Sequence, residues 1–372
     1  MDNPFKNFFA KSDTNVLGID IGSSAIKVVQ LAKVKGRAVL KTYGSLALGP
    51  YAGLTIGQST NMSPDRLGEA IKDLLKEANT TTINAGVSIP LRSSLVTLIE
   101  MPALPDAKLR EMIPIEARKF IPVPISEVAL DWWIIPHEED NSFDFDIEVK
   151  EKKIQKQDKT EVLLVSIHNE VLQGYNSIVQ ASGLHATFFE IEMFAAIRSL
   201  VEREIAPVMI FDMGASSTKI YITERGIVKE SHIINKGSQD ITISISKGLQ
   251  VTIEKAEKIK RNLGEGSPAD QKQVYDIVSL TLDYIFAEAG GLMVAYQKKH
   301  NKSISKVYLT GGGVAMKGFF DIARSRFETE VVLGDPFSKV DAPVFLSDLL
   351  KQTGLDFAVA VGIALRKLQE LD

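Results

Sequence analysis

The chain has 372 residues, enough to bury a substantial core and to form at least two domains. A hydrophobic content of 45%, a charged content of 24% and a net charge of −4 are typical of a globular protein without a basic nucleic-acid surface. Because the chain has no cysteine, disulfides, cysteine nucleophiles and cysteine-bound zinc are excluded.

The first residues, 1–14, contain Phe5, Phe8 and Phe9 among lysines but no long apolar run. We therefore expect neither a signal peptide nor a transmembrane segment here, and the same holds for the rest of the chain. Two interpretations remain for this N-terminal segment. It is either a helical cap packed on the first domain or an amphipathic turn that contacts a membrane or a partner.

A strand–turn–strand pattern follows from Val16 to Val29, with Asp20 at the end of the first apolar run and Gly22, Ser23 and Ser24 in the turn. Glycine allows close backbone approach, turn N–H groups and serine hydroxyls bind phosphate oxygens, and the aspartate suits Mg²⁺ or its water shell. One such hairpin is weak support for phosphate binding, because Asp-Gly turns join many strands.

The region between residues 37 and 205 reads as alternating strands and helices. Ser63 and Pro64 open a helix that runs to about Ala78. The other expected elements are strands at 37–46, 84–89, 95–100, 128–135, 161–167 and 187–191, and helices from 106, at 169–181 and at 193–204. Residues 138–161 are dense in acidic and then basic side chains, and we interpret them as a solvated hairpin or loop, or else as a partner-binding arm.

The hairpin pattern recurs from Val208 to Tyr221, with Asp212 followed by Gly214, Ala215 and Ser216. A mainly helical portion, about 240–300, comes next. A strand at 306–309 then runs into the triplet Gly311, Gly312 and Gly313 and a helix at about 317–327. The apolar run 357–365 is too short to span a bilayer, and we expect a buried final helix there.

Two Asp-Gly hairpins followed by a glycine turn resemble the two phosphate motifs and the adenosine motif of the actin-like ATPase superfamily. The resemblance implies an α/β, ribonuclease H-like fold with two lobes, and ATP or ADP with Mg²⁺ in the cleft. It implies Asp20 and Asp212 as metal-facing carboxylates, Lys27 as a phosphate-binding lysine, and the glycines and serines of both turns as phosphate donors.

Two further assignments rest on the same resemblance. Glu257 and Lys260 lie on one helical face and are similar to the adenosine-contacting pair of actin-like proteins, although alone they would read as a solvated face. Glu192 is the weak candidate for orienting the attacking water, with Glu190 as its rival. We therefore expect nucleotide binding with slow or no hydrolysis.

The segment from Glu100 through the prolines Pro102, Pro122 and Pro124 to Asp131 is similar to the PilM family of FtsA-like proteins of type IV pilus assembly. The resemblance implies an inserted subdomain of the FtsA type (1C, SHS2-like). It also implies five units, which are the segment 1–14, a first nucleotide-binding subdomain 15–84, the insertion 85–187, a connecting helix 188–205 and a second lobe 206–372 that includes the helical portion.

The PilM resemblance implies an ATP-binding cytoplasmic scaffold, peripheral at the inner membrane, whose partner is the cytosolic N-terminal tail of a PilN-like single-span membrane protein. Indirect contact with pilus motor ATPases is also implied, and self-association is left open. The alternatives are an FtsA-like filament protein and an actin-superfamily small-molecule kinase. Because the chain stops at Asp372 soon after Leu365, we expect no FtsA-type membrane-targeting helix. The five histidines have no metal-ligand spacing, and no Walker A motif is present.

Overall fold

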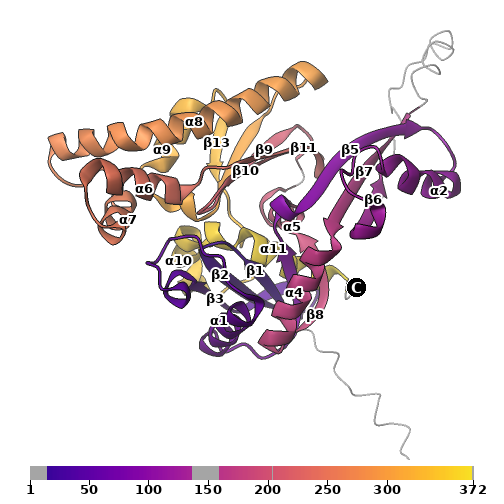
Figure 1. The fold of residues 1–372 in the computed structure, drawn as a ribbon, viewed down its shortest axis with the longest axis horizontal. Helices are drawn as coiled ribbons and strands as arrows, with labels where there is room; N and C mark the ends of the chain where they lie inside the picture. The colour runs from indigo at the N-terminus through magenta and orange to yellow at the C-terminus, as the bar shows by residue number, and fades with distance from the viewer. Residues whose placement is uncertain (1–14, 136–158, 203, 371–372) are drawn as a thin grey trace, which may run out of the picture.

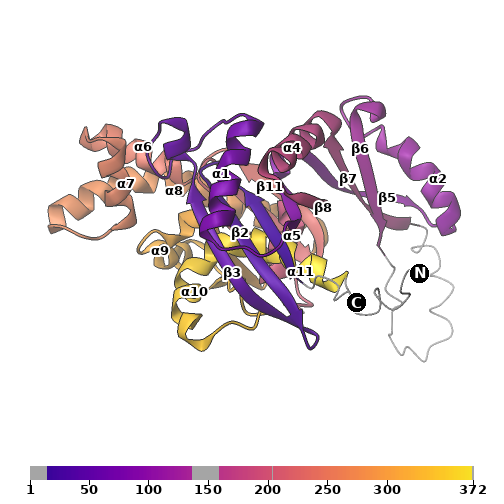
Figure 2. The ribbon, with the colours of Figure 1, turned by 90° about the horizontal axis from the view of Figure 1, so that it is seen from below.

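The computed structural model describes residues 15–135, 159–202 and 204–370, and Figure 1 shows them as two large lobes and a smaller sheet. The expectations for residues 1–14, and for 138–158 of the charged stretch, lie outside these described residues. Figure 2 shows the small sheet and the helices of the second lobe at opposite ends of the molecule, with the first lobe between them.

The first lobe is built on a five-stranded sheet of order β3-β2-β1-β4-β8. Its central strand β1 is antiparallel to β2 and parallel to β4. Helices α1 and α4 pack together over one face, and α5 and α11 cover the other. The bounds are β1 (Asn15–Ile21), β2 (Ala25–Val34), β3 (Arg37–Ala47), α1 (Pro64–Glu77), β4 (Asn84–Ile89), α4 (Asn169–Ser182), β8 (His185–Ile191), α5 (Glu192–Leu200) and α11 (Ala358–Gln369).

Strand β1 is apolar on both faces because helices cover both faces of the sheet. Leu17 and Ile19 belong to the core beneath α1 and α4, whereas Val16 belongs to the core beneath α11. Between them, a β-carbon on Gly18 would lie 1.9 Å from the carbonyl oxygen of Ala360. Only glycine therefore allows α11 to lie this close to the strand that carries Asp20.

The second lobe repeats the plan with a sheet of order β11-β10-β9-β12-β13. Its β9–β10 hairpin is antiparallel and β12 runs parallel to β9, as β4 does to β1. Phe211 of β9 packs against Phe286, Phe319 and Phe327 of the helical layer. The bounds are β9 (Val208–Met213), β10 (Thr218–Glu224), β11 (Ile227–Ile234), α6 (Ser238–Leu249), α7 (Ile253–Arg261), α8 (Pro268–His300), β12 (Lys306–Thr310), α9 (Phe319–Arg326) and β13 (Glu330–Leu333). Helix α10 (Ser347–Thr353) follows in the chain, but its Leu350 packs into the core of the first lobe.

Helix α8 is the one helix among the described residues that is long and apolar enough to cross a membrane, judged by length and composition alone. Only 28% of its most apolar 18-residue window is buried. One side of the helix nevertheless supplies Val278, Leu282, Ile285 and Phe286 to the core of the second lobe.

The smaller sheet, of order β5-β7-β6, forms an inserted subdomain with α2 against one face. It comprises β5 (Ser94–Pro102), α2 (Asp106–Ala117), β6 (Val128–Ile134) and β7 (Lys159–His168). The expected insertion of 85–187 was therefore too wide, because β4, α4 and β8 belong to the first lobe. Alternating strands and helices look the same in sequence whichever sheet they join, so the pattern could not place that boundary.

Two other expected boundaries also differ from the structure. The connecting helix was expected over 188–205, but α5 spans Glu192–Leu200 and the residues before it complete β8. The second lobe was expected to reach residue 372, but α11 packs on β1, β2 and α5 of the first lobe. An apolar helix pattern shows that α11 is buried without showing which sheet covers it.

Candidate nucleotide-binding site

The two Asp-Gly hairpins have the same geometry. Asp20 is directly opposite Lys27 across the β1–β2 pair, and Asp212 is directly opposite Lys219 across the β9–β10 pair. In both turns the glycine N–H donates to a backbone oxygen three residues later, at 3.0 Å. Each hairpin thus presents a carboxylate and an ammonium together, with Lys27 Nζ 3.7 Å from Asp20 and Lys219 Nζ 3.4 Å from Asp212.

Both hairpins line one cavity of about 340 Å³ between the lobes. The structure thereby brings together most of the residues that the sequence analysis selected. Those lining the cavity are Asp20, Gly22, Ser23, Ser24, Lys27, Glu192, Asp212, Gly214, Ala215, Ser216, Gly311 and Gly312. Their side chains and turns come from β1, β2, β9, β10, the start of α5 and the turn after β12.

The glycine turn after β12 approaches the cavity walls so closely that side chains would not fit. Gly311 has a φ of +88°, and a β-carbon on it would lie 2.4 Å from Asp212 Oδ1. A β-carbon on Gly312 would lie 2.6 Å from Asp356 Oδ1. Gly313 does not line the cavity, since it packs behind the turn against Met213. The turn is therefore a backbone wall, which is the form that suits a polyanionic ligand.

Asp356 is a site residue that the sequence analysis did not identify. Its Oδ1 is buried without a hydrogen-bond partner in the described structure, and the residue lines the cavity. Leu355, the residue before it, accepts hydrogen bonds from Gly311 N and Thr310 Oγ1, which fixes the carboxylate beside the glycine turn. No motif surrounds Asp356, so only the folded chain reveals it. An unsatisfied carboxylate oxygen fits a metal-bound water or a ligand hydroxyl.

Lys219 was also missed, although both hairpins share an aspartate and a lysine seven residues apart. Burial alone would lower the pKa of Lys27, but the carboxylates of Asp20, Asp356 and Asp212 outweigh burial and raise it. The pKa of Lys219 is likewise raised, because Asp212 and Glu192 outweigh its burial. Both ammonium groups therefore stay charged in the cavity and can bind phosphate oxygens.

Glu192 lines the cavity, but both of its oxygens already have partners. Oε1 accepts the backbone N–H of Leu91 at 2.8 Å, and Oε2 lies 2.7 Å from Lys219 Nζ. Burial raises the pKa of the carboxyl, and the charge of Lys219 only partly opposes this. Glu192, at the start of α5, is therefore bound both to the second hairpin, through Lys219, and to the entry of the inserted subdomain, through Leu91.

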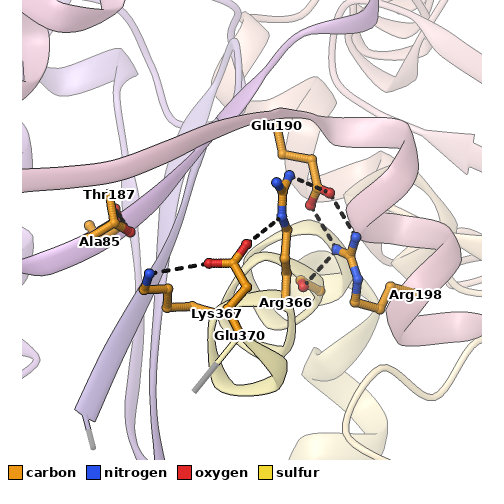
Figure 3. Close-up of polar contacts among 8 residues, drawn as sticks. Ala85, Thr187, Glu190, Arg198, Arg366, Lys367 and Glu370 are labelled. Carbon is orange, nitrogen blue, oxygen red and sulfur yellow. Dashed lines mark hydrogen bonds and ion pairs between the residues drawn. The ribbon is translucent and has the colours of Figure 1, made fainter. Parts of the chain in front are cut away.

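The rival glutamate, Glu190, lies outside the cavity. Figure 3 shows its carboxylate between Arg198 and Arg366, with hydrogen bonds of 2.7 Å to two nitrogens of Arg198 and 3.0 Å to Arg366. Arg366 also lies over the Phe188 ring, 4.4 Å from its centroid. Glu190 thus fastens β8 to α5 and α11.

Glu257 and Lys260 do not line the cavity either. On α7 they form a buried ion pair of 2.7 Å, and Thr242 donates to Glu257. The first lobe closes against them, since a β-carbon on Gly57 would lie 3.1 Å from the Glu257 carboxyl group. The backbone N–H of Ser59 also donates to Gln239 of α6. In this conformation the lobes therefore touch at the adenosine side of the expected site.

The described residues contain no group of three or more histidine or acidic side chains arranged to hold a metal ion. Mg²⁺ beside phosphates usually binds through one or two carboxylates, substrate oxygens and water. Asp20 is already oriented for such a role by the Ser88 hydroxyl, which donates to its Oδ1 at 2.9 Å.

Comparison with known proteins decides the family. The profile of a family described as type IV pilus assembly protein PilM matches residues 18–368. This chain belongs to the PilM family. A solved structure titled "PilM-PilN type IV pilus biogenesis complex" is 23% identical, with a TM-score of 0.78, and the match covers 95% of this chain and 98% of that chain.

Two further kinds of relative agree on the actin-like fold of this PilM-family chain. The ethanolamine utilization protein EutJ from Carboxydothermus hydrogenoformans is 13% identical with a TM-score of 0.53, covering 94% of this chain and 89% of its own. Cell division protein FtsA of Neisseria meningitidis is 22% identical over 352 residues, or 86% of this chain and 83% of that protein. FtsA of Bacillus subtilis is 22% identical over 242 residues, and the match spans about half (54%) of its length and 59% of this chain. The predicted α/β, actin-like fold is confirmed.

Proposed function

We propose that this PilM-family chain binds ATP or ADP with Mg²⁺ between its lobes. In its nucleotide-bound conformation the chain holds the tail of a membrane protein during type IV pilus assembly. One observation carries the nucleotide half of the proposal. Two Asp–Lys hairpins in the same register line one cavity beside a glycine turn too tight for side chains.

In this proposal, carboxylates bind the metal, and lysines, hydroxyls and backbone N–H groups bind the phosphate chain. Asp20 and Asp212 face Mg²⁺ or its waters, and Asp356 joins them with its unsatisfied oxygen. Lys27 and Lys219 compensate phosphate charge, and the turn N–H groups with Ser23, Ser24 and Ser216 donate to phosphate oxygens. Bound magnesium would supply charge neutralisation and orient the terminal phosphate.

We further propose that hydrolysis is slow. Glu192 is the candidate for orienting water, but its oxygens are already occupied by Leu91 N and Lys219 Nζ. A general base must be within hydrogen-bond reach of the proton it takes, and the ion pair with Lys219 opposes proton uptake by this carboxyl group. The nucleotide therefore acts as a conformational ligand rather than as fuel for rapid turnover. Glu257 and Lys260 would contact the adenosine end only if the lobes open.

The partner half of the proposal rests on a second cavity, of about 560 Å³, which we call the tail groove. Trp133 of β6, Phe194 and Ile197 of α5, and Leu365 and Leu368 of α11 give it an apolar lining. Lys33, Arg37, Arg198 and Lys339 also line it, against the single acidic residue Glu202 among its lining residues. An extended peptide with apolar side chains and acidic or carbonyl acceptors would suit this lining.

We propose that the occupant is the cytosolic N-terminal tail of a PilN-like single-span membrane protein. The similar solved structure is titled as a complex with PilN, and the groove includes Trp133 from the inserted subdomain, as the proposed partner site requires. Trp133 is 56% exposed, whereas Trp132 packs into the core of the inserted subdomain. The tail would hold the chain at the cytoplasmic face of the inner membrane, where contact with motor ATPases would be indirect.

Helix α5 connects the two sites. Its first residue, Glu192, lines the nucleotide cavity, and Phe194 and Ile197 line the tail groove. The inserted subdomain is tied to Glu192 through Leu91 N, and to the second lobe through Glu161 and Lys229, whose charged groups lie 2.6 Å apart. A shift of α5 on nucleotide binding would therefore alter the groove, and thermodynamics requires the effect to be reciprocal.

A pull-down with the tail peptide tests the partner assignment. Trp133→Ala should weaken capture about tenfold or more, because aromatic anchors in grooves dominate such interfaces. Phe120→Ala is the matched control, since Phe120 is 45% exposed on the same subdomain but does not line the groove. Equal loss in both variants, or no loss in either, would remove the tail groove from the proposal.

A further inference from the structure

The outward side of α8 carries an apolar stripe that nothing in the described structure covers. Leu280 is 76% exposed, Tyr284 50% and Val294 49%. Ala287 and Gly291 lie between them and are also exposed. Figure 1 shows α8 along one edge of the second lobe, with α6 and α9 on its inner side. Large side chains at this level of exposure over one helix face mark an interaction surface.

The spacing of the stripe is that of a helix–helix seam. Positions 280, 284, 287, 291 and 294 follow one another at intervals of four, three, four and three residues. This is the repeat with which one helix presents a narrow seam to another. Over these positions the stripe is about 21 Å long.

The middle of the stripe is shaped for close approach. A β-carbon on Gly290 or Gly291 would meet nothing within 4 Å, so packing within the chain does not require either glycine. Glycine inside a helix costs about 1 kcal/mol relative to alanine. A neighbouring helix that crosses here would benefit from the missing side chains, as small residues let two backbones approach.

Charge and symmetry favour one partner for the stripe, which is a second copy of α8 running antiparallel. About a two-fold axis at Ala287, Leu280 of one copy is opposite Val294 of the other, and Tyr284 is opposite the glycines. Asp276 is then opposite Lys298. Both are exposed, and neither has an ion-pair partner within the described part of the chain. A parallel arrangement would instead place like charges together at both ends.

A lipid surface fits α8 less well than a second copy. Asp276, Asp283 and Glu288 flank the stripe, whereas helices that lie on anionic membranes carry lysine and arginine there. The opposite side of α8 also supplies the core of the second lobe, so the helix cannot enter a bilayer while the lobe stays folded. We propose that this chain forms a two-fold dimer through antiparallel α8–α8 packing centred on Ala287.

The absence of cysteine makes the axis directly testable. In the full chain, Ala287→Cys should form an intermolecular disulfide under mild oxidation, because facing positions at a close helix crossing come within disulfide range. Gln297→Cys is the control. It is exposed on the same helix but turned off the stripe, and it should cross-link at least about tenfold less.

Sedimentation equilibrium then tests the energetics. A single helix–helix contact about 21 Å long is smaller than a standard protein interface, so the dimer should be weak. The average mass should rise over about 1–200 μM protein. Leu280→Asp should raise the dissociation constant about tenfold or more. Asp276→Lys and Lys298→Asp should each weaken the dimer, and the double variant should recover most of the wild-type affinity.

Three outcomes would overturn the dimer. The first is a monomer at all concentrations together with no Ala287→Cys cross-link. The second is a dimer that Leu280→Asp leaves intact. The third is a monomer that co-sediments with phosphatidylglycerol vesicles in a Leu280-dependent way, which would assign the stripe to a membrane surface. Circular dichroism of each variant ensures that an unfolded α8 is not mistaken for a lost interface.

Discussion

Lys219 Nζ lies 2.7 Å from Glu192 Oε2, and this ion pair joins the second phosphate-type hairpin to the first turn of α5. The other oxygen of Glu192 accepts the N–H of Leu91, at the entry to the inserted subdomain. A ligand that draws Lys219 toward its phosphates would therefore compete with Glu192 for that ammonium and loosen the second hairpin from α5. Through Glu192, the candidate nucleotide cavity is thus connected to α5 and to the inserted subdomain.

Glu192→Gln tests whether this carboxylate activates water. The amide keeps an acceptor for Leu91 N but loses the charge that binds Lys219. Because a positioned general base contributes about 10²–10⁴-fold, a fall of that size in single-turnover hydrolysis would assign the role to Glu192. We expect turnover to be slow in the wild type and to change less than about threefold in the variant.

Glu190→Ala should destabilise the fold without affecting nucleotide binding. Glu190 is buried between Arg198 and Arg366, so its removal leaves two guanidinium groups without their shared carboxylate. We expect a loss of about 3 kcal/mol in the free energy of unfolding, measured with urea. Glu370→Ala removes a more exposed carboxylate that pairs with Arg366, and it should cost less than about 1 kcal/mol. Equal small losses in both variants would contradict the assigned role of Glu190.

Gly311→Ala should be destabilising because the positive φ and the proximity of Asp212 both oppose a β-carbon. The expected cost is about 1–3 kcal/mol, together with weaker nucleotide binding from the displaced wall. Gly174→Ala in α4 is the matched control. A β-carbon there meets nothing within 4 Å, and the change should stabilise the helix by about 0.5–1 kcal/mol. A neutral Gly311→Ala would show that the turn is not the rigid wall described here.

Lys27→Met should lower the free energy of unfolding below pH 10.5, and the difference from wild type should shrink as the pH rises further. Burial opposes the charged form of Lys27, but Asp20, Asp356 and Asp212 raise its pKa above the ordinary 10.5. A raised pKa in the folded state gives stability that is fully present below 10.5 and is lost as the pH rises through the folded value. Urea titrations from pH 8 upward should therefore show a constant difference between wild type and variant up to about pH 10.5 and a shrinking difference above it. A difference that stays constant above pH 10.5 would contradict the electrostatic account.

The sequence predicted the parts of the fold that have a strong local pattern. The two hairpins, the glycine turn after β12 and the final buried helix all lie where local pattern placed them, because alternation and Asp-Gly turns are local signals. The same repeat contains a signal for Lys219, which follows Asp212 by seven residues as Lys27 follows Asp20.

The remaining features depend on contacts between distant segments. Asp356 lies in no motif and enters the cavity only because the neighbouring Leu355 binds the turn after β12. The insertion boundaries were wrong because strands β4 and β8 resemble the strands of the smaller sheet, and sequence does not reveal which strands pair. Glu257 and Lys260 were predicted beside the nucleotide, but in the structure their charges face each other and the Gly57 loop covers them.

The most direct test of the account is calorimetric titration of the full chain with MgATP, performed with and without the PilN-like tail peptide. The wild type should bind one nucleotide saturably, and Asp20→Ala or Asp212→Ala should abolish Mg²⁺-dependent binding while the melting temperature stays within a few degrees. Glu69→Ala, an exposed carboxylate on α1, is the control and should bind normally. No binding by the folded wild type under either condition, or binding by both aspartate variants as tight as that of the wild type, would show that the cavity between the hairpins is not a Mg²⁺–nucleotide site.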